Sequence, residues 1–298
     1  MIASWPERQF MKDTLPVRHL VPAMSADEAI DLTNRRTLLV RGDVDHVVTS
    51  SEIGLRPDGE PLYVLIKNAI PEEFCTAAFP VALRAANDSV IGGSRAVAAG
   101  AYMEPRTRKD GSTANYLEVP FMSHLVGAKN GIMGFFDKPQ CRLTDFSARD
   151  WEQFQETLPL IRKVNEIFRI YLPERFANQA EAVSDVDEKY IIPGTVFSTI
   201  TDNLNFRTAC HCDEGDFERG FGALTMLTCG EFWGGELAFP RYRVAVDYRM
   251  GDVLLCDVHE VHGNLPIRGF EGEYSRLSLV CYLRAAMLKV CPAKPRIA

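Results

Sequence analysis

The sequence predicts a mainly β fold of the α+β class, built on a jelly-roll core, the double-stranded β-helix, with supporting helices before it. From Tyr190 onward, short β-branched and aromatic runs alternate with Gly and Pro turns, which is typical of a jelly roll. Before that point, two stretches carry apolar residues at helical spacing. We expect one compact unit over residues 1–298, with a mixed α/β supporting portion at 1–189 and the jelly-roll core at 190–290.

The first portion is expected to be irregular over residues 1–60, where Pro and Gly are scattered. Leu62–Ile66 is a short apolar run and predicts a buried strand. Pro71 with two following acidic residues predicts the start of a helix that continues to about Ala86.

Residues 91–140 are rich in glycine and predict loops and short strands. Ser147–Asp150 resembles a capping box and predicts the start of a helix that runs to about Tyr171. Pro159 lies inside that stretch, so we expect the helix to be kinked or split there.

Six runs after residue 190 predict the strands of the core, because each is short, apolar and bounded by turn residues. They are Val196–Thr201, Gly222–Leu227, Gly235–Phe239, Val244–Tyr248, Val253–Cys256 and Leu277–Leu283.

The composition is that of an ordinary globular protein, with 46% apolar and 24% charged residues in 298. No apolar run is long enough for a membrane span, and the N-terminus has no apolar signal core. We therefore expect no membrane partner and an intracellular, cytoplasmic protein, nuclear if the host is a eukaryote. The net charge of −7 argues against a general nucleic-acid-binding surface, although a local basic patch is compatible with it.

Eight cysteines are spread along the chain without a CxxC pair. This pattern predicts neither a zinc ribbon nor, in a reducing compartment, disulfides. Most of the cysteines are expected to be small buried apolar residues.

Three residues form a candidate metal site. His211 and Asp213 are two positions apart, so on an extended strand both side chains point to one face. A third ligand must come from elsewhere, and His259 and His262 are the two candidates. We favour His262, because it lies where the strand from Val253 is expected to end, whereas His259 would point to the other face. Two histidines and one carboxylate leave metal positions open, which suits Fe(II) that binds a cosubstrate and O2.

Arg276 and Ser278 follow at positions that share a strand face, fourteen residues after His262. The planar guanidinium of Arg276 suits the distal carboxylate of 2-oxoglutarate, and the Ser278 hydroxyl can add a hydrogen bond. The set His211, Asp213, His262 and Arg276 therefore predicts an iron(II)- and 2-oxoglutarate-dependent dioxygenase, with the whole chain as one catalytic unit.

With these residues in place, the chain resembles the Tet/J-binding-protein family of 2-oxoglutarate dioxygenases. The likeness covers about residues 190–284, and a segment at Gly131–Asp137 with the helix after it is also similar. The motifs that carry it are Gly194–Thr199, His211–Asp216, Gly220–Leu224, Gly234–Pro240, Gly251–His262 and Arg276–Tyr282. The chain looks closer to the thymine-hydroxylating J-binding proteins than to animal Tet enzymes.

The resemblance implies a jelly-roll core, Fe(II), 2-oxoglutarate and O2, and oxidation of the 5-methyl group of thymine or 5-methylcytosine in DNA. It also implies that the target base leaves the helical stack to reach the iron. We expect neither the appended DNA-binding domain of J-binding proteins nor the large Cys-rich segment of animal Tet enzymes.

Cations near flexible glycines are candidate DNA contacts, although each could equally be part of a solvated charged loop. Three further polar residues could order the site or serve as turn or packing residues. The candidate contacts are Arg95, Arg106, Arg108, Lys109, Arg241 and Arg243, and the candidate ordering residues are Asn205, Asp216 and His259.

Other functions fit the same sequence. The same chemistry could act on a free nucleoside, nucleotide or amino acid, which the acidic net charge favours. A jelly-roll binding module without catalysis is a second alternative, and the complete ligand set argues against it. A protein hydroxylase is a third.

Overall fold

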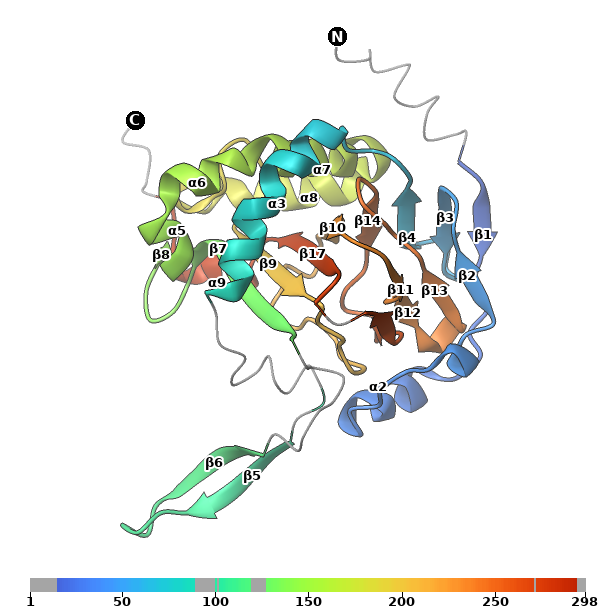
Figure 1. The fold of residues 1–298 in the computed structure, drawn as a ribbon, viewed down its shortest axis with the longest axis horizontal. Helices are drawn as coiled ribbons and strands as arrows, with labels where there is room; N and C mark the ends of the chain where they lie inside the picture. The colour runs from blue at the N-terminus through green and yellow to red at the C-terminus, as the bar shows by residue number, and fades with distance from the viewer. Residues whose placement is uncertain (1–14, 89–99, 101, 119–126, 271, 294–298) are drawn as a thin grey trace.

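Two β-sheets face each other, and helices cover the outer side of the larger sheet (Figure 1). The computed structural model describes residues 15–88, 100, 102–118, 127–270 and 272–293. This arrangement confirms the predicted jelly-roll core with supporting helices.

The larger sheet has nine strands in the order β1-β3-β4-β14-β10-β17-β9-β7-β8, and all neighbours are antiparallel except β1 and β3. Their bounds are β1 Val17–His19, β3 Glu52–Leu55, β4 Pro61–Ile66, β7 Lys129–Phe136, β8 Arg142–Leu143, β9 Thr199–Leu204, β10 Gly222–Cys229, β14 Val253–Cys256 and β17 Ser275–Tyr282.

The smaller sheet has the order β15-β12-β13-β2, with β13 and β2 parallel. Its strands are β15 Gly263–Asn264, β12 Leu237–Phe239, β13 Val244–Val246 and β2 His46–Val48. Apolar side chains of both sheets fill the space between them. Among them, Tyr63 of β4 and Phe239 of β12 stack with ring centroids 6.2 Å apart. All six strands predicted after residue 190 overlap a strand of one of these sheets.

Two ribbons lie outside these sheets. One pairs β11 (Phe232–Gly234) with β16 (Ile267–Gly269), and the other is a hairpin of β5 (Tyr102–Thr107) and β6 (Thr113–Glu118). Figure 1 shows the β5–β6 hairpin extending away from the rest of the molecule.

The helices are short to medium in length, and α3 and α7 pack on the larger sheet. Within the described residues, none of the helices has both the length and the apolar character that crossing a membrane requires. Their bounds are α2 Ala26–Asn34, α3 Glu72–Asn87, α5 Asp145–Arg149, α6 Trp151–Glu156, α7 Leu158–Tyr171, α8 Pro173–Ser184 and α9 Ala285–Val290, with 3-10 turns η1 Arg41–Asp43, η3 Glu188–Tyr190 and η4 Pro240–Tyr242.

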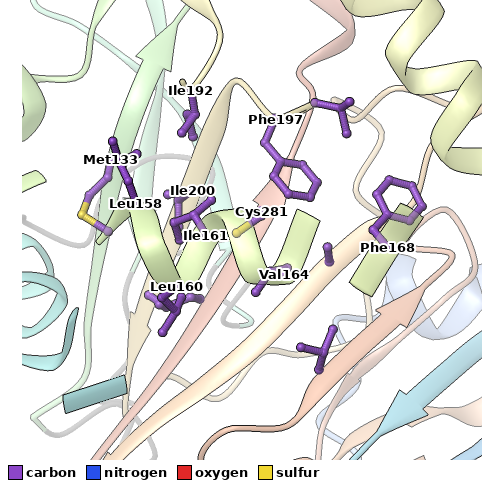
Figure 2. Packing of buried hydrophobic residues seen from close by; sticks show 14 of the residues in the cluster. Met133, Leu158, Leu160, Ile161, Val164, Phe168, Ile192, Phe197, Ile200 and Cys281 are labelled. Carbon is purple, nitrogen blue, oxygen red and sulfur yellow. The ribbon is translucent and has the colours of Figure 1, made fainter. Parts of the chain in front are cut away.

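Helix α7 joins the helical layer to the sheet because its apolar residues recur at helical spacing. Figure 2 shows Ile161, Val164 and Phe168 of α7 beside Ile200 of β9 and Cys281 of β17. All five side chains are buried, so this layer fixes the position of the strands that carry the site.

Pro159 splits the predicted helix in two, as expected. Helix α6 ends at Glu156 and α7 begins at Leu158, so Pro159 lies in the first turn, where its missing N–H is not needed. The predicted capping box at Ser147 was wrong. Thr144 caps α5 instead, and the Ser147 hydroxyl accepts the backbone N–H of Gly134 at 2.8 Å.

The prediction that residues 1–60 are irregular was wrong for the described part. It contains α2, which starts with a capping box between Ser25 and Glu28, and the strands β1, β2 and β3. These strands are three or four residues long, too short for a readable alternation. They form because other strands pair with them: β3 pairs with the nearby β4 and with β1, and β2 pairs with the distant β13, where Val47 lies opposite Ala245.

Strands from before residue 190 therefore belong to both sheets of the core. The division of the chain into 1–189 and 190–290 stays a prediction, since no boundary between the sheets falls at that point.

The prediction of no disulfide was also wrong, because Cys141 and Cys291 are bonded, with Cα atoms 5.7 Å apart. Their separation of 150 residues explains why spacing alone did not indicate the pair. Four free cysteines are buried as expected: Cys75, Cys210, Cys256 and Cys281.

Candidate active site

Three side chains converge between the two sheets, although one of them is far from the other two in the sequence. His211, Asp213 and His262 each offer one ligand atom, and these atoms all lie within 4.8 Å of one another. The Nε2 atom of His211 is 3.6 Å from Oδ1 of Asp213, and Nε2 of His262 is 3.8 Å from Oδ2 of Asp213. A single ion can therefore contact all three.

Backbone pairing aligns the two histidines. The N–H of His211 donates to the carbonyl of His262 at 2.9 Å, and the N–H of His262 donates back at 3.0 Å. Residues that are directly opposite in an antiparallel pair carry their side chains on one face. The ring centroids are accordingly 4.3 Å apart. Asp213 is held by its N–H, which donates to the carbonyl of Val258.

The expected route to His262 was wrong in one respect. Strand β14 ends at Cys256, and a loop of five residues, 257–261, separates it from His262. His262 stands directly before β15 rather than at the end of β14. The loop is needed because the chain crosses from the larger sheet to the smaller one between these strands.

Each imidazole is oriented by a backbone carbonyl. Nδ1 of His211 lies 2.8 Å from the carbonyl oxygen of Ala209, and Nδ1 of His262 lies 2.9 Å from that of Glu260. These contacts place the ring proton on Nδ1, where it is donated to the carbonyl, and leave Nε2 with a free lone pair. Both Nε2 lone pairs are then available to a metal.

The protonation state of His262 also suits metal binding. Burial, together with the neighbouring His211, lowers the pKa of His262 to about 4. The ring is therefore neutral near pH 7, and a neutral imidazole is the form that ligates a metal.

Arg276 lies in the interior between the sheets, with 1% of its surface exposed. Its Nη2 donates to the carbonyl of Gly235 at 2.7 Å, and its Nε has no partner among the described residues. Burial lowers the pKa of Arg276, and the charge of Arg249 lowers it further, whereas Tyr248 and Glu236 act in the opposite direction. None of the described carboxylates forms an ion pair with Arg276. A buried cation without a counterion is costly, so this position favours an anionic ligand.

Ser278 shares the buried face of β17 with Arg276, as predicted from their spacing. Its hydroxyl is 2.6 Å from the hydroxyl of Tyr248, and the Cζ atom of Arg276 is 5.9 Å from the centroid of the Tyr248 ring. Tyr248 was not predicted as a site residue, because it reaches this point from a different sheet, two residues after β13.

Asn205 holds the backbone of Arg276 on both sides. Its N–H donates to the carbonyl of Arg276, and its side-chain oxygen accepts the N–H of Arg276, each at 2.8 Å. Asn205 has a φ of +48°, a left-handed conformation that asparagine adopts more readily than most residues. It therefore has the contacts of an ordering residue.

His259 and Asp216 lie beside the cluster rather than in it. Nδ1 of His259 is 3.4 Å from Asp257, and its Nε2 is 3.3 Å from the carbonyl oxygen of Asp216. Asp216 belongs to the turn after Asp213 and forms a β-bridge with Arg284. Both residues thus contact the loops that carry the ligands.

The second pair of predicted DNA contacts is bound within the protein. Arg241 lies 3.4 Å from Glu260, and Arg243 makes two contacts of 2.8 Å with Asp45. Both cations therefore already interact with carboxylates of this chain, and their contact with DNA stays a prediction.

The first group of predicted contacts is described only in part. Arg95 lies outside the described residues, and Arg106 is on β5 with its side chain outside them. Arg108 and Lys109 are exposed at the turn of the β5–β6 hairpin, so this segment is a β-ribbon rather than a simple loop.

The face of β17 that carries Arg276 continues to the end of the strand beside β10, whose other neighbour, β14, leads into the loop before His262. Alternation places Val280 and Tyr282 on that face, and Arg284 follows just beyond the strand. The Tyr282 hydroxyl lies 3.2 Å from that of Thr201, and the Cζ atom of Arg284 is 4.4 Å from the ring centroid of Phe136. The same two-residue step that connects Arg276 to Ser278 could have indicated these residues from the sequence.

Comparison with known proteins agrees with this geometry. The Tet_JBP family model, described as the oxygenase domain of the 2OGFeDO superfamily, matches residues 131–285. The chain is 33% identical over 260 residues to the bifunctional helicase and thymine dioxygenase JBP2 of Leishmania major, covering 84% of this chain and 21% of that protein. It is 38% identical over 170 residues to the thymine dioxygenase JBP1 of Trypanosoma brucei brucei, covering 54% of this chain and 20% of that protein.

The chain thus spans about a fifth of the length of these curated relatives. Among solved structures, NgTET1 in complex with 5mC DNA aligns with a TM-score of 0.56 and 13% identity, over 91% of this chain and 94% of that one. That likeness shows a shared fold. Because the family model matches just over half of the chain, and JBP2 matches most of it, the chain belongs to the Tet/JBP family of oxygenase domains in the 2OGFeDO superfamily.

Proposed function

We propose that this chain is an iron(II)- and 2-oxoglutarate-dependent dioxygenase that hydroxylates the 5-methyl group of a pyrimidine base in DNA. The observation that carries the proposal is the convergence of His211, Asp213 and His262, together with the buried Arg276, whose Nε has no partner among the described residues. Arg276 donates to the carbonyl of Gly235, which also accepts from Asn264, two residues after His262. The two histidines and the aspartate suit a metal ion, and the arginine suits an anion.

The ligand set fits Fe(II). Two imidazole nitrogens and one carboxylate bind from one side, which leaves further positions for a chelating cosubstrate and O2. When bound, the iron and 2-oxoglutarate activate O2 to oxidise a C–H bond of the substrate. The protein would hold the reactants in place and exclude water from the space between the sheets.

The cosubstrate site fits 2-oxoglutarate. The Nε of Arg276 has no partner among the described residues, and the Ser278 hydroxyl lies on the same buried face of β17. A guanidinium binds a carboxylate through two parallel hydrogen bonds, so the distal carboxylate of 2-oxoglutarate would neutralise the buried charge. Asn205 would keep Arg276 at this position through its two backbone hydrogen bonds.

The substrate base would bind on the face that leads from Arg276 to the metal. Tyr282 offers an aromatic ring and a hydroxyl, and Arg284 offers donors for a pyrimidine carbonyl. Arg284 is held by Asp137, whose Oδ1 is 2.6 Å from its Nε. A base in duplex DNA must leave the stack to reach such a site.

DNA as the substrate is supported by the relatives. The curated relatives are named thymine dioxygenases, and the solved structure NgTET1 holds 5mC DNA. We therefore propose thymine as the first base to test and 5-methylcytosine as the second.

A substrate panel tests the proposal. The protein with Fe(II), 2-oxoglutarate and ascorbate is incubated with thymine DNA, 5-methylcytosine DNA or free thymidine nucleotides, and nucleosides are analysed by mass spectrometry. We expect one added oxygen on a base in DNA. Succinate formed without DNA oxidation would contradict DNA as the substrate, and modified free nucleotides would point to a small molecule.

Variants of the cluster complete the test. His211→Ala and Asp213→Ala should each abolish 2-oxoglutarate turnover, because each removes one of three ligands. His46→Ala, which removes an exposed histidine on β2, is the matched control and should leave turnover unchanged. Turnover near the wild-type rate in both cluster variants would overturn the metal assignment.

A further inference from the structure

We propose that Tyr248 is a direct binding residue for the distal carboxylate of 2-oxoglutarate, acting together with Arg276 and Ser278. The inference rests on the proposed function and adds a third side chain to the cosubstrate site. It assigns the Tyr248 hydroxyl as a hydrogen-bond donor to the carboxylate.

Position is the first argument. Tyr248 follows β13 on the smaller sheet, and its hydroxyl reaches across to β17 of the larger sheet, where it lies 2.6 Å from the Ser278 hydroxyl. The Arg276 guanidinium is next to the same ring, at 5.9 Å from its centroid. All three residues are at most 4% exposed. Side chains from both sheets therefore form one buried polar cluster.

The balance of donors and acceptors is the second argument. The two hydroxyls share one hydrogen bond, which uses one of their two protons. Arg276 brings five N–H donors: Nη2 contacts the carbonyl of Gly235, the guanidinium also interacts with the Tyr248 hydroxyl, and Nε has no partner among the described residues. The group therefore has donors in excess, and none of the described carboxylates forms an ion pair with it. A carboxylate supplies two oxygens with about four acceptor sites, which matches this excess.

Gly235 provides the third argument. A Cβ atom at this position would lie 2.8 Å from Nε of Arg276, so only glycine leaves room beside the guanidinium. Its φ of +77° is also in the region that favours glycine. The backbone at Gly235 and the ring of Tyr248 thus bound the space in which Arg276 can accept an anion.

The test is a comparison of two keto acids. Calorimetric titration without oxygen, with Fe(II) present, measures the Kd of 2-oxoglutarate and of 2-oxobutyrate, which has the same keto-acid end but no distal carboxylate. Tyr248→Phe removes only the hydroxyl. We expect it to raise the Kd of 2-oxoglutarate about 10-fold or more, the effect of one hydrogen bond to a charged group, and to leave the Kd of 2-oxobutyrate unchanged.

Tyr171→Phe is the matched control, because Tyr171 is a buried tyrosine on α7, in the helical layer. It should change neither Kd. An unchanged Kd of 2-oxoglutarate in Tyr248→Phe would overturn the inference, and so would an equal rise for both keto acids, which would indicate a structural role. Failure of the wild-type protein to bind 2-oxoglutarate would instead overturn the proposed function itself.

Discussion

At the scale of single residues, the main feature is a buried charge that forms no ion pair with the described carboxylates. Arg276 is 1% exposed, its Nη2 donates to the carbonyl of Gly235, and Glu236 acts on it without an ion-pair contact. Such a charge costs stability in the absence of a ligand. Sites that bind anions accept this cost because the ligand offsets it on binding.

Replacement of Arg276 by Met should therefore separate stability from binding. The variant removes the unpaired charge, and Gly235 keeps a hydrogen bond from the side chain of Asn264 at 3.3 Å. We expect the ligand-free protein to gain about 1–3 kcal/mol in unfolding free energy, by analogy with buried charges replaced by apolar residues, and to lose 2-oxoglutarate binding. Urea unfolding and calorimetry measure the two effects.

Arg169→Met, at an exposed position on α7, is the control and should change neither quantity by much. A ligand-free Arg276→Met protein that is less stable than wild type would mean that Arg276 is already neutralised in the folded protein.

At the scale of elements, the loop of residues 257–261 before His262 is held by charged side chains. Asp257 pairs with Arg56 at 2.5 Å, and Glu260 lies near Arg56 and Arg241. Burial alone would raise the pKa of Asp257, but hydrogen bonds from His259 and the charge of Arg56 outweigh it and hold that pKa well below its usual range. The loop is thus anchored while Asp257 is ionised.

This ion pair predicts a loss of stability in acid. A carboxylate with a depressed pKa contributes stability that is present above its unfolded pKa, about 3.9, and is lost as the pH falls below it. Asp257→Asn should therefore be less stable than wild type at pH 6, and the gap should shrink between pH 5 and pH 3. Urea unfolding across this range measures it. For Asp27→Asn, at an exposed position, the difference in unfolding free energy from wild type should be small and the same at every pH. A difference that does not change with pH for Asp257→Asn would contradict the ion-pair assignment.

The β5–β6 hairpin is the element for which we predict contacts with DNA. It extends away from the body of the protein (Figure 1), and Arg108 and Lys109 are exposed at its turn. A two-stranded ribbon fits the major groove of duplex DNA. The cations would contribute phosphate contacts without sequence readout.

The double variant Arg108→Ala/Lys109→Ala should weaken DNA binding and reduce the slope of log K against log salt by about 1–2, since each lost phosphate contact contributes about 0.9. Fluorescence anisotropy with labelled duplex measures the slope. The control Arg169→Ala/Lys289→Ala removes two exposed cations on α7 and α9. Equal slopes for wild type and the hairpin variant would exclude the hairpin as a contact.

At the scale of the whole molecule, distant parts of the chain are joined at several places. The disulfide between Cys141 and Cys291 connects the turn before β8 to the end of α9 across 150 residues. A crosslink over so long a loop restricts the unfolded chain and stabilises the fold by about 2–5 kcal/mol.

Cys291→Ser should lower the unfolding free energy by about this amount while leaving metal binding intact, because the disulfide is remote in sequence from the ligands. Cys229→Ser, at an exposed free cysteine, should have no effect. Unfolding with and without reductant, with thiols counted by mass spectrometry, measures both. Equal stability of Cys291→Ser and wild type would contradict the role of the crosslink.

The sequence by itself determined the local parts of this protein. Short apolar runs bounded by turn residues indicated the core strands, proline indicated the break between α6 and α7, and the spacing of His211, Asp213, Arg276 and Ser278 indicated a metal and carboxylate chemistry. These features are readable because a strand or a helix places residues on one face by its own periodicity.

Only the tertiary structure decided which distant residues meet. It brought Tyr248 to Ser278, bound Arg241 and Arg243 to carboxylates, paired β1 with β3 and β2 with the distant β13, and joined Cys141 to Cys291. Such contacts depend on sheet pairing and packing between segments that no local pattern connects. For this reason, the candidate ligands could be proposed from spacing and strand position, whereas the residues around them required the fold.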